Sequence, residues 1–350
     1  MDRISSKWIF ILAIVCGGFS TQTLSARVTG PCANCHTMHN SQNGAPINPS
    51  GPQNNLLTTS CVGCHSSTSS ATIVTLGSTQ IPIVYNTVVP TNPLAGGNFY
   101  WVRKGGGNDR MGHNVYGISN TDATLTWAPG NAGAGCGGLG SCHKTLADPP
   151  NANMYKLGGC QGCHVSVSHH ADKGWYRFLA NQLHDPNDYA TGIESPDWEQ
   201  NPSASNHNGY HGTTDVYSAG SGGSTEHTIT SFCQGCHGAF HGPQSGVNGT
   251  QNVDYGMGSS SPWIRHPTDV ALPSTGEYAG YNPVTSYSVQ APVAWIDPAN
   301  PTRAGAVVMC LSCHRAHGSP YASMLRWDYT TMVASGGGTG GCFICHTLKD

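Results

Sequence analysis

The chain has 350 residues, of which only 9% are charged, and its formal net charge is −3 with histidine neutral. No cluster of Lys and Arg forms a basic patch, which argues against a nucleic-acid-binding protein. The 46 Gly and 22 Pro residues, without a regular repeat, are typical of chains that fold poorly unaided. The 15 Cys and 18 His are therefore the residues that carry most information about fold and chemistry.

The first 26 residues have the features of an export signal. Arg3 and Lys7 give a positive start, Trp8–Val15 is an apolar run, and a candidate cleavage site ends at Ala26. The run is short for a transmembrane helix, and no later stretch could span a membrane. A lipoprotein acylated at Cys16 is a weaker alternative, because the usual preceding residues are absent. We expect residues 1–26 to be a signal peptide and the remaining chain to be exported.

Six segments of the chain spell Cys-x-x-Cys-His, the motif that attaches c-type haem. The two thiols bond to the porphyrin vinyl groups, and the adjoining His is the proximal iron ligand. Structural zinc needs a second Cys pair or distant His ligands, and it does not require His directly after each pair. We expect haem attachment at Cys32, Cys35, Cys61, Cys64, Cys160, Cys163, Cys233, Cys236, Cys310, Cys313, Cys342 and Cys345, with His36, His65, His164, His237, His314 and His346 as proximal ligands.

A seventh haem is predicted at a stretched form of the motif. Cys136 and Cys142-His143 keep the Cys-His ending but have five residues between the thiols. The insert is rich in Gly, so the chain can bulge without steric cost and still bring both sulfurs to the porphyrin. The alternative is a short disulfide loop, with His143 serving another haem. We favour haem, because every other cysteine after the signal segment belongs to a haem pair.

The motif spacing predicts a helical turn, with both thiols and the following His on one face. Between the motifs, long Gly/Ser/Asn/Pro-rich intervals lack a helical hydrophobic period. Extended runs are expected at Ile81–Val89 and Ser286–Ile296, where Pro82 and Pro292 favour edge strands or coil. We therefore predict a multihaem cytochrome c fold of one domain, residues 27–350, mostly coil with short helices at the motifs, few strands and a haem-stack core.

Each iron also needs a sixth ligand or an open site. Eleven His remain for seven haems once the proximal residues are subtracted, and this surplus favours bis-His ligation over Met ligation or an open iron. The preferred distal candidates are His39, His113, His169, His170, His241, His266 and His317. Four further His rank below them, namely His184, His207, His211 and His227.

Three of these candidates lie directly after a proximal ligand. His39 and His317 follow one by three residues, and His241 follows one by four. On a helical turn, a His at this spacing cannot reach the far side of the same haem, but it can reach a neighbouring one. The adjacent His169 and His170 could likewise serve two different haems.

Several local motifs resemble the outer-surface multihaem cytochromes of metal-respiring bacteria that polymerise into extracellular nanowires, especially the hexahaem member. The shared segments, in the same order, are 35–41, 112–114, 265–267, 310–317 and 342–346. The chain departs from that family in the expanded motif at Cys136–His143 and in the additional motif at 160–164. In that family, the His three residues after the first proximal His ligates a haem of the adjacent subunit. The resemblance implies that His39 caps the iron of His314 in the next protomer.

The predicted function is long-range electron transfer through closely stacked haems, not enzymatic catalysis. The resemblance implies a homopolymeric filament, at the cell surface or outside the cell, which receives electrons from donor cytochromes and passes them to extracellular acceptors. The alternative is a monomeric surface or periplasmic carrier. A multihaem reductase ranks last, because it needs an open iron and no Cys-x-x-Cys-Lys motif is present.

Overall fold

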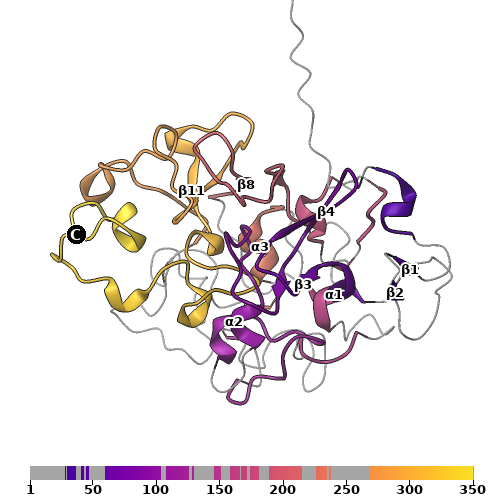
Figure 1. Cartoon of the computed structure of the whole chain (residues 1–350). Coiled ribbons are helices and arrows are strands. Elements are labelled where there is room, and N and C mark those ends of the chain that lie inside the picture. Colours follow the sequence, from indigo (N-terminus) through magenta and orange to yellow (C-terminus); the bar gives the residue numbers. More distant parts are fainter. Residues whose placement is uncertain are drawn as a thin grey trace, which may run out of the picture.

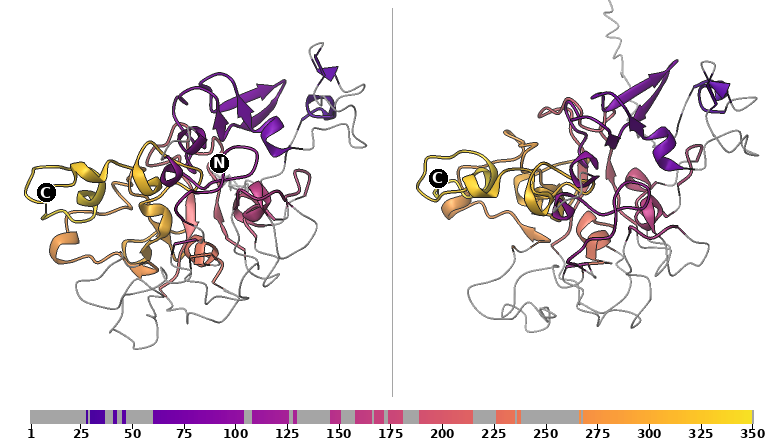
Figure 2. Two further views of the ribbon diagram at one scale, coloured as in Figure 1. Left: turned by 90° about the horizontal axis from the view of Figure 1, so that it is seen from below. Right: turned by 60° about the horizontal axis from the view of Figure 1, so that its bottom comes forward.

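The computed structural model describes residues 28, 30–36, 41–42, 45–46, 60–103, 108–125, 128–129, 146–150, 158–165, 167–171, 174–180, 189–214, 226–234, 236–237, 266 and 268–349. Coil and turns dominate this part of the chain (Figure 1). The segment around the first Cys pair lies at one end of the molecule and the C-terminal segment at the opposite end (Figures 1 and 2). The expected signal segment, residues 1–26, falls outside the described residues.

The helices are short, and six of them include or begin at a Cys of the haem motifs. These six are η1 (Cys32–Asn34), α1 (Cys61–Cys64), η4 (Gly159–Gly162), α3 (Ile229–Gln234), η9 (Cys310–Ser312) and η12 (Gly341–Ile344). The others are α2 (Tyr100–Arg103), η3 (Asp109–Met111), η5 (Tyr176–Phe178), η7 (Gly276–Tyr278), η8 (Arg303–Gly305), η10 (Ala322–Met324) and η11 (Tyr329–Thr331). The prediction of mostly coil with short helices at the motifs is confirmed.

The strands are also short and form small sheets. Three two-stranded sheets pair β1 (Ser41–Gln42) with β2 (Ala45–Pro46), β3 (Ser66–Ser67) with β6 (Tyr85–Asn86), and β4 (Ile73–Leu76) with β5 (Thr79–Pro82). A five-stranded sheet has the order β7-β8-β10-β11-β9, from β7 (Gly192–Ile193), β8 (Gly209–His211), β9 (Val270–Ala271), β10 (Ala294–Trp295) and β11 (Ala306–Val308).

The expectation for Ser286–Ile296 is wrong in one respect. It contains β10, which is the central strand of the five-stranded sheet rather than an edge. Pro292 precedes the strand, so it removes no N–H from the ladder, and Ala294 pairs with Tyr210 on one side and Val307 on the other. By contrast, Ile81–Val89 contributes to β5 and β6, and each of these pairs with a single neighbour.

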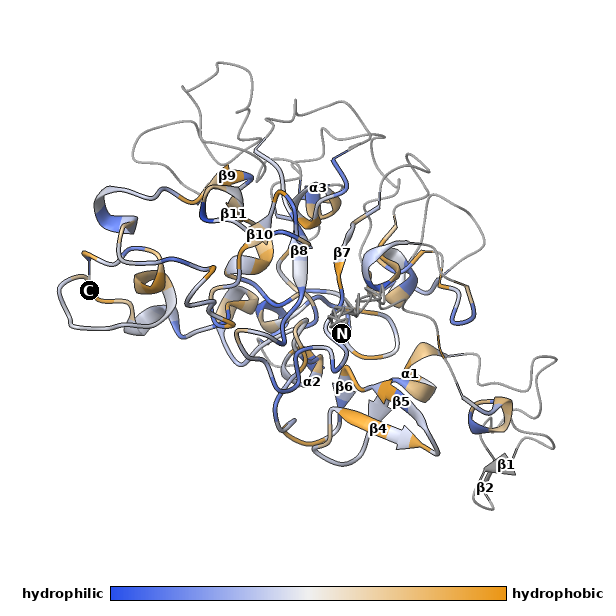
Figure 3. Ribbon diagram, turned by 90° about the horizontal axis from the view of Figure 1, so that it is seen from above, coloured by the Kyte–Doolittle hydropathy of each residue, from blue (hydrophilic) through white to orange (hydrophobic). Residues whose placement is uncertain are grey.

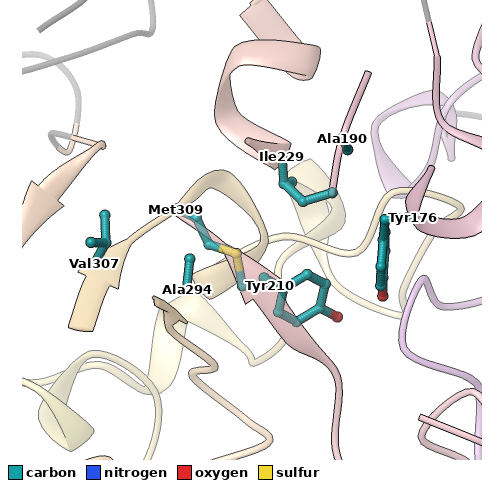
Figure 4. Packing of buried hydrophobic residues seen from close by; sticks show 7 residues of the cluster. All are labelled: Tyr176, Ala190, Tyr210, Ile229, Ala294, Val307 and Met309. Carbon is teal, nitrogen blue, oxygen red and sulfur yellow. The ribbon is translucent and has the colours of Figure 1, made fainter. Parts of the chain in front are cut away.

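Three small clusters of buried side chains lie beside the haem motifs. The largest, shown in Figure 4, consists of Tyr176, Ala190, Tyr210, Ile229, Ala294, Val307 and Met309, and Cys233 packs against it. A second cluster, around Val293 and Trp295, packs against Cys345, and a third, around Phe99, packs against Cys160. Apolar residues are scattered in short stretches over many segments, for example along β4 and β7 (Figure 3). The peptide clusters therefore support individual motifs rather than forming one large core.

A buried pair of amides fixes the segment that follows the second Cys pair. Asn98 donates to the Asn86 side-chain oxygen at 2.7 Å, and the Asn86 amide donates to the carbonyls of Ser69 and Ala71, both at 2.8 Å. Neither Asn86 nor Asn98 is exposed to solvent. Because buried polar groups are costly unless paired, this network holds the loops after α1 in one arrangement.

Replacing Ile229 with Ala should lower the free energy of unfolding by about 2–5 kcal/mol, because it leaves a cavity in the largest cluster. Ile229 is 2% exposed and begins α3, which carries Cys233. The matched control is Ile193→Ala, at a residue that is 45% exposed, with an expected loss below about 1 kcal/mol. Urea denaturation followed by circular dichroism measures both, and equal losses would contradict this description of the core.

Candidate haem sites

Each described Cys-x-x-Cys-His motif is a single closed helical turn. The backbone N–H of the His donates to the carbonyl of the first Cys in all six, four residues earlier. The N···O distances are 2.8 Å at His36, 2.9 Å at His65 and His164, 3.0 Å at His237 and His346, and 3.1 Å at His314. This bond fixes the two thiols and the imidazole relative to one another, as haem attachment requires. The expanded motif at Cys136, Cys142 and His143 lies outside the described residues.

Four proximal candidates have their imidazole orientation set by a backbone carbonyl. Their Nδ1 atoms lie 2.8–3.1 Å from carbonyl oxygens on other segments. A carbonyl only accepts, so Nδ1 carries the proton and Nε2 keeps its lone pair for a metal. The contacts are His65 to Pro82 (2.8 Å), His164 to Arg177 (3.1 Å), His237 to Pro129 (2.8 Å) and His314 to Ser323 (2.8 Å), and the distal candidate His113 contacts Ala316 (2.7 Å).

Two of these carbonyls come from residues with left-handed backbone conformations. Arg177 has φ +49° and Ser323 has φ +58°, which costs roughly 1–2 kcal/mol for a residue other than Gly. The conformation of Arg177 is held by the buried carboxylate of Glu194, which accepts from the Arg177 backbone N–H at 2.7 Å and pairs with its guanidinium at 3.2 Å. Local strain of this kind is common at functional sites.

Imidazole rings from distant parts of the chain face one another in pairs. Two imidazoles bonded at about 2 Å to one metal have ring centres about 6 Å apart. Five such pairs are present among the described residues, with centre-to-centre distances of 6.0–6.4 Å. They are His36 with His170 (6.0 Å), His65 with His169 (6.1 Å), His164 with His317 (6.4 Å), His237 with His113 (6.1 Å) and His346 with His266 (6.2 Å).

Each pair joins one proximal candidate to one preferred distal candidate. The adjacent His169 and His170 face different proximal residues, and His317 faces His164 rather than the neighbouring His314. Ligation of two different haems by His169 and His170, and of a neighbouring haem by His317, would need such arrangements. No imidazole of the described residues faces His314, and the remaining preferred candidates, His39 and His241, lie outside them.

Burial favours the neutral form of five of the paired imidazoles. Desolvation, together with neighbouring His residues, lowers the pKa of His317 to about 3. Desolvation in the same way lowers the pKa of His237 to about 4, and it lowers those of His113, His164 and His169. Metal binding requires the neutral form of imidazole, so these residues need not lose a proton at pH 7 to become ligands.

The lower-ranked candidates have different surroundings. His207 stacks on the Tyr287 ring with centres 3.6 Å apart, and His227 stacks on Tyr189 at 4.0 Å. His211 lies in β8. None of the three faces a second imidazole within the described ranges, and His184 is outside them.

The motifs lie next to one another in chain order. The Cys61 thiol is hydrogen-bonded to that of Cys160, which lowers the pKa of Cys61 to about 6, and Cys233 has the same contact with Cys310. Thiol–thiol electrostatic contacts also join Cys35 to Cys64, Cys163 to Cys236, and Cys313 to Cys342 and Cys345. The six described motifs therefore form a continuous series from 32–36 to 342–346.

The residues do not converge as an ordinary metal site would. No group of three or more His, Cys, Asp or Glu in the described part of the chain surrounds one position, and the motif thiols there form no disulfide. Pairs of imidazoles beside pairs of thiols instead fit an iron porphyrin, which supplies the other four ligands itself. No helix among the described residues is long and apolar enough to cross a membrane.

Comparisons with known proteins agree with this chemistry. The family described as "Doubled CXXCH motif" matches residues 300–350, which contain the last two motifs. The curated protein "C-type cytochrome OmcS" of Geobacter sulfurreducens is 27% identical over 362 aligned positions, covering 87% of this chain and 81% of that protein.

Two solved structures from the same organism also match. They are the Outer Membrane Cytochrome S filament (TM-score 0.47) and the OmcS nanowires (TM-score 0.45). Each is 20% identical, and each match covers 93% of this chain and 91% of the other.

The motifs, the paired imidazoles and the sequence match define a multihaem c-type cytochrome. Within that class, the chain resembles OmcS over most of its length. Haem c is its cofactor type.

Sequence reasoning missed the residues that orient the imidazoles. Pro82, Pro129, Arg177 and Ser323 act through backbone carbonyls, which every residue possesses, so their side chains carry no signal for this role. Their contribution depends on the path of the chain, which the three-dimensional structure supplies.

Replacing His317 with Ala should leave one iron without its sixth ligand, because His317 faces His164. We expect resonance Raman spectra of the purified protein to gain high-spin bands from one haem. The control His207→Ala removes an imidazole stacked on Tyr287 and should leave the spin state unchanged. A fully low-spin spectrum for His317→Ala, with normal haem content, would contradict the pairing.

Proposed function

We propose that this chain is an electron conduit in which bis-His c-type haems form a line through the protein. The observation that carries the proposal is the set of five imidazole pairs at 6.0–6.4 Å. Six-coordinate bis-His irons have no vacancy for a substrate, so they exchange electrons rather than bind and reduce small molecules. This favours electron transfer over a reductase.

Each haem in this proposal is bonded through its Cys pair and ligated by its own His and a distant one. The five proposed distal ligands are His170, His169, His317, His113 and His266, for the haems of His36, His65, His164, His237 and His346 respectively. We take His207 and His227 as packing residues, because each stacks on a tyrosine ring.

The order of the motifs supports conduction across the whole molecule. The thiols of successive described motifs lie close enough to interact electrostatically, and the first and last motifs lie at opposite ends (Figure 2). An electron that enters at one end can therefore pass from haem to haem and leave at the other. In this proposal residues 27–350 form one domain after removal of residues 1–26.

His314 is the basis for a proposed polymer. Its Nδ1 is fixed by the Ser323 carbonyl, but no imidazole of the described residues faces it. We propose that His39 of an adjacent copy supplies the missing ligand. The contact joins different surfaces of the two copies, so it does not close on itself, and repetition gives a filament. OmcS, to which this chain is 27% identical, is a filament in its solved structures.

The proposed cellular location follows from covalent haem attachment and polymerisation. The filament would lie at the cell surface or outside the cell, accept electrons from donor cytochromes and pass them to extracellular acceptors. A monomeric carrier with the same haems is the alternative outcome of the test below.

We also propose a seventh haem at Cys136, Cys142 and His143. With six described motifs occupied, these two cysteines are the remaining pair after the signal segment. The Gly-rich insert gives the chain the freedom that the wider spacing requires.

Replacing His39 with Ala should abolish or greatly shorten filaments, because it removes the inter-subunit ligand while leaving all Cys pairs intact. Negative-stain electron microscopy measures filament length, and mass spectrometry confirms haem loading. The matched variants His184→Ala and His241→Ala change two other candidates outside the described residues and should still polymerise. Normal filaments from His39→Ala would rule out this bond.

The mass of the mature protein tests the seventh haem. We expect seven haem masses in the native chain, and one fewer in a variant with both Cys136 and Cys142 replaced by Ala. Six haem masses in the native chain, together with a disulfide between these two cysteines, would overturn the assignment.

A further inference from the structure

The last proximal histidine has a different kind of partner from the others. Whereas His65, His164, His237 and His314 contact backbone carbonyls, His346 Nδ1 lies 3.2 Å from the Glu277 carboxylate oxygen Oε1. The N–H direction is not aligned with this oxygen, so the contact is a close electrostatic one rather than a well-formed hydrogen bond. At the motif 342–346 a carboxylate thus faces the proximal candidate, where those four have a backbone carbonyl.

The backbone holds Glu277 in this position. Glu277 lies in η7, and its carbonyl accepts from both the backbone N–H and the hydroxyl of Thr347, at 2.8 Å and 2.7 Å. Thr347 directly follows His346, so these two bonds tie the carboxylate-bearing turn to the motif itself. The centre of the Tyr278 ring lies 5.1 Å from that of the His346 ring.

Lys349 and His346 contact different oxygens of the Glu277 carboxylate. Its ammonium lies 3.0 Å from Glu277 Oε2, while Oε1 faces the imidazole. Hydrogen bonds from Lys349 and Tyr278 hold the pKa of Glu277 below its usual value. The carboxylate is therefore charged at neutral pH.

We propose that Glu277 is a positioning residue that lowers the reduction potential of the haem at Cys342–His346. A negative charge beside Nδ1–H makes imidazole a stronger electron donor, which favours ferric over ferrous iron. The proposal rests on the proposed attachment of haem at this motif. It assigns to this haem the role of a more reducing member at one end of the line.

The neighbouring haem site carries charge of the opposite sign. Arg326 is only 6% exposed, and its Nε donates to the carbonyls of Leu311 at 2.7 Å and His314 at 3.2 Å. Within the described ranges no carboxylate lies at ion-pair distance from its guanidinium. A buried positive charge beside the His314 motif favours the ferrous form there. The opposite charges therefore lower the reduction potential of the His346 haem and raise that of the His314 haem. Electron transfer from the His346 haem to the His314 haem is then energetically favourable.

The ring geometry provides a way to observe the His346 haem separately. The rings of His266 and His346 are nearly perpendicular, at 87°, whereas the other four pairs have angles of 17–50°. Perpendicular imidazoles leave two iron d orbitals nearly degenerate, which gives a strongly anisotropic low-spin electron paramagnetic resonance (EPR) signal. A redox titration that follows this signal therefore reports on one haem.

Glu277→Gln removes the charge and keeps the side-chain size. In an EPR-monitored titration of the full-length holoprotein, we expect its ferrous-to-ferric ratio at fixed potential to rise about tenfold at this haem, equivalent to 59 mV for one electron. Lys349→Met removes the opposing charge from an exposed side chain and should shift the ratio in the other direction. The control Asp328→Asn removes a carboxylate that binds only Thr330 among the described residues and should leave the ratio unchanged.

Haem content, measured by mass spectrometry, distinguishes a failure of the proposed role of Glu277 from a failure of the proposed haem attachment at Cys342–His346. A protein fully loaded at Cys342–His346 whose potential is unchanged in both Glu277→Gln and Lys349→Met would overturn the role of Glu277 alone. An equal shift in Asp328→Asn would do the same, since it would indicate a general charge effect. Native protein without haem at this motif would overturn the proposed attachment, and with it the inference.

Discussion

The facing of imidazoles from distant segments, at the spacing of two ligands on one iron, is the constraint on which the rest of this structure depends. Each pair joins segments far apart in sequence, such as His164 with His317 and His113 with His237. In the proposed ligation, iron–imidazole bonds at these positions would tie the long Gly/Pro-rich intervals together, much as metals and disulfides stabilise small domains. This accounts for a defined shape in a chain whose described helices have at most six residues and whose described sheets have at most five strands.

The polypeptide mainly fixes the positions of the haem-binding side chains rather than supplying a large hydrophobic core. A helical turn sets the thiols and the proximal imidazole, a carbonyl from another segment sets the ring, and a small cluster of buried residues supports the motif from behind. Arg177 and Ser323 adopt unfavourable backbone conformations to present two of these carbonyls. The local cost is offset by neighbouring contacts, as the Arg177–Glu194 pair illustrates.

The chemistry of this protein was readable from its sequence, whereas the partners of each haem were not. Cysteine and histidine spacing predicted the helical turns and the class of protein, because the thiols and the proximal ligand are local in sequence. The pairing of His317 with His164 depends on tertiary folding, as does the central place of β10 in its sheet. Glu277 gave no signal, since it lies 69 residues before His346 and meets it only because η7 is bonded to Thr347.

Closed, bis-His irons are the central claim, because conduction, the exclusion of a substrate site and the proposed link between copies all follow from them. Near-infrared magnetic circular dichroism of the fully oxidised native protein tests this most directly, since its charge-transfer bands distinguish pairs of axial ligands. We expect bands of bis-imidazole, low-spin haem to account for all the iron in the assembled protein. A substantial high-spin or His/Met population would contradict the account.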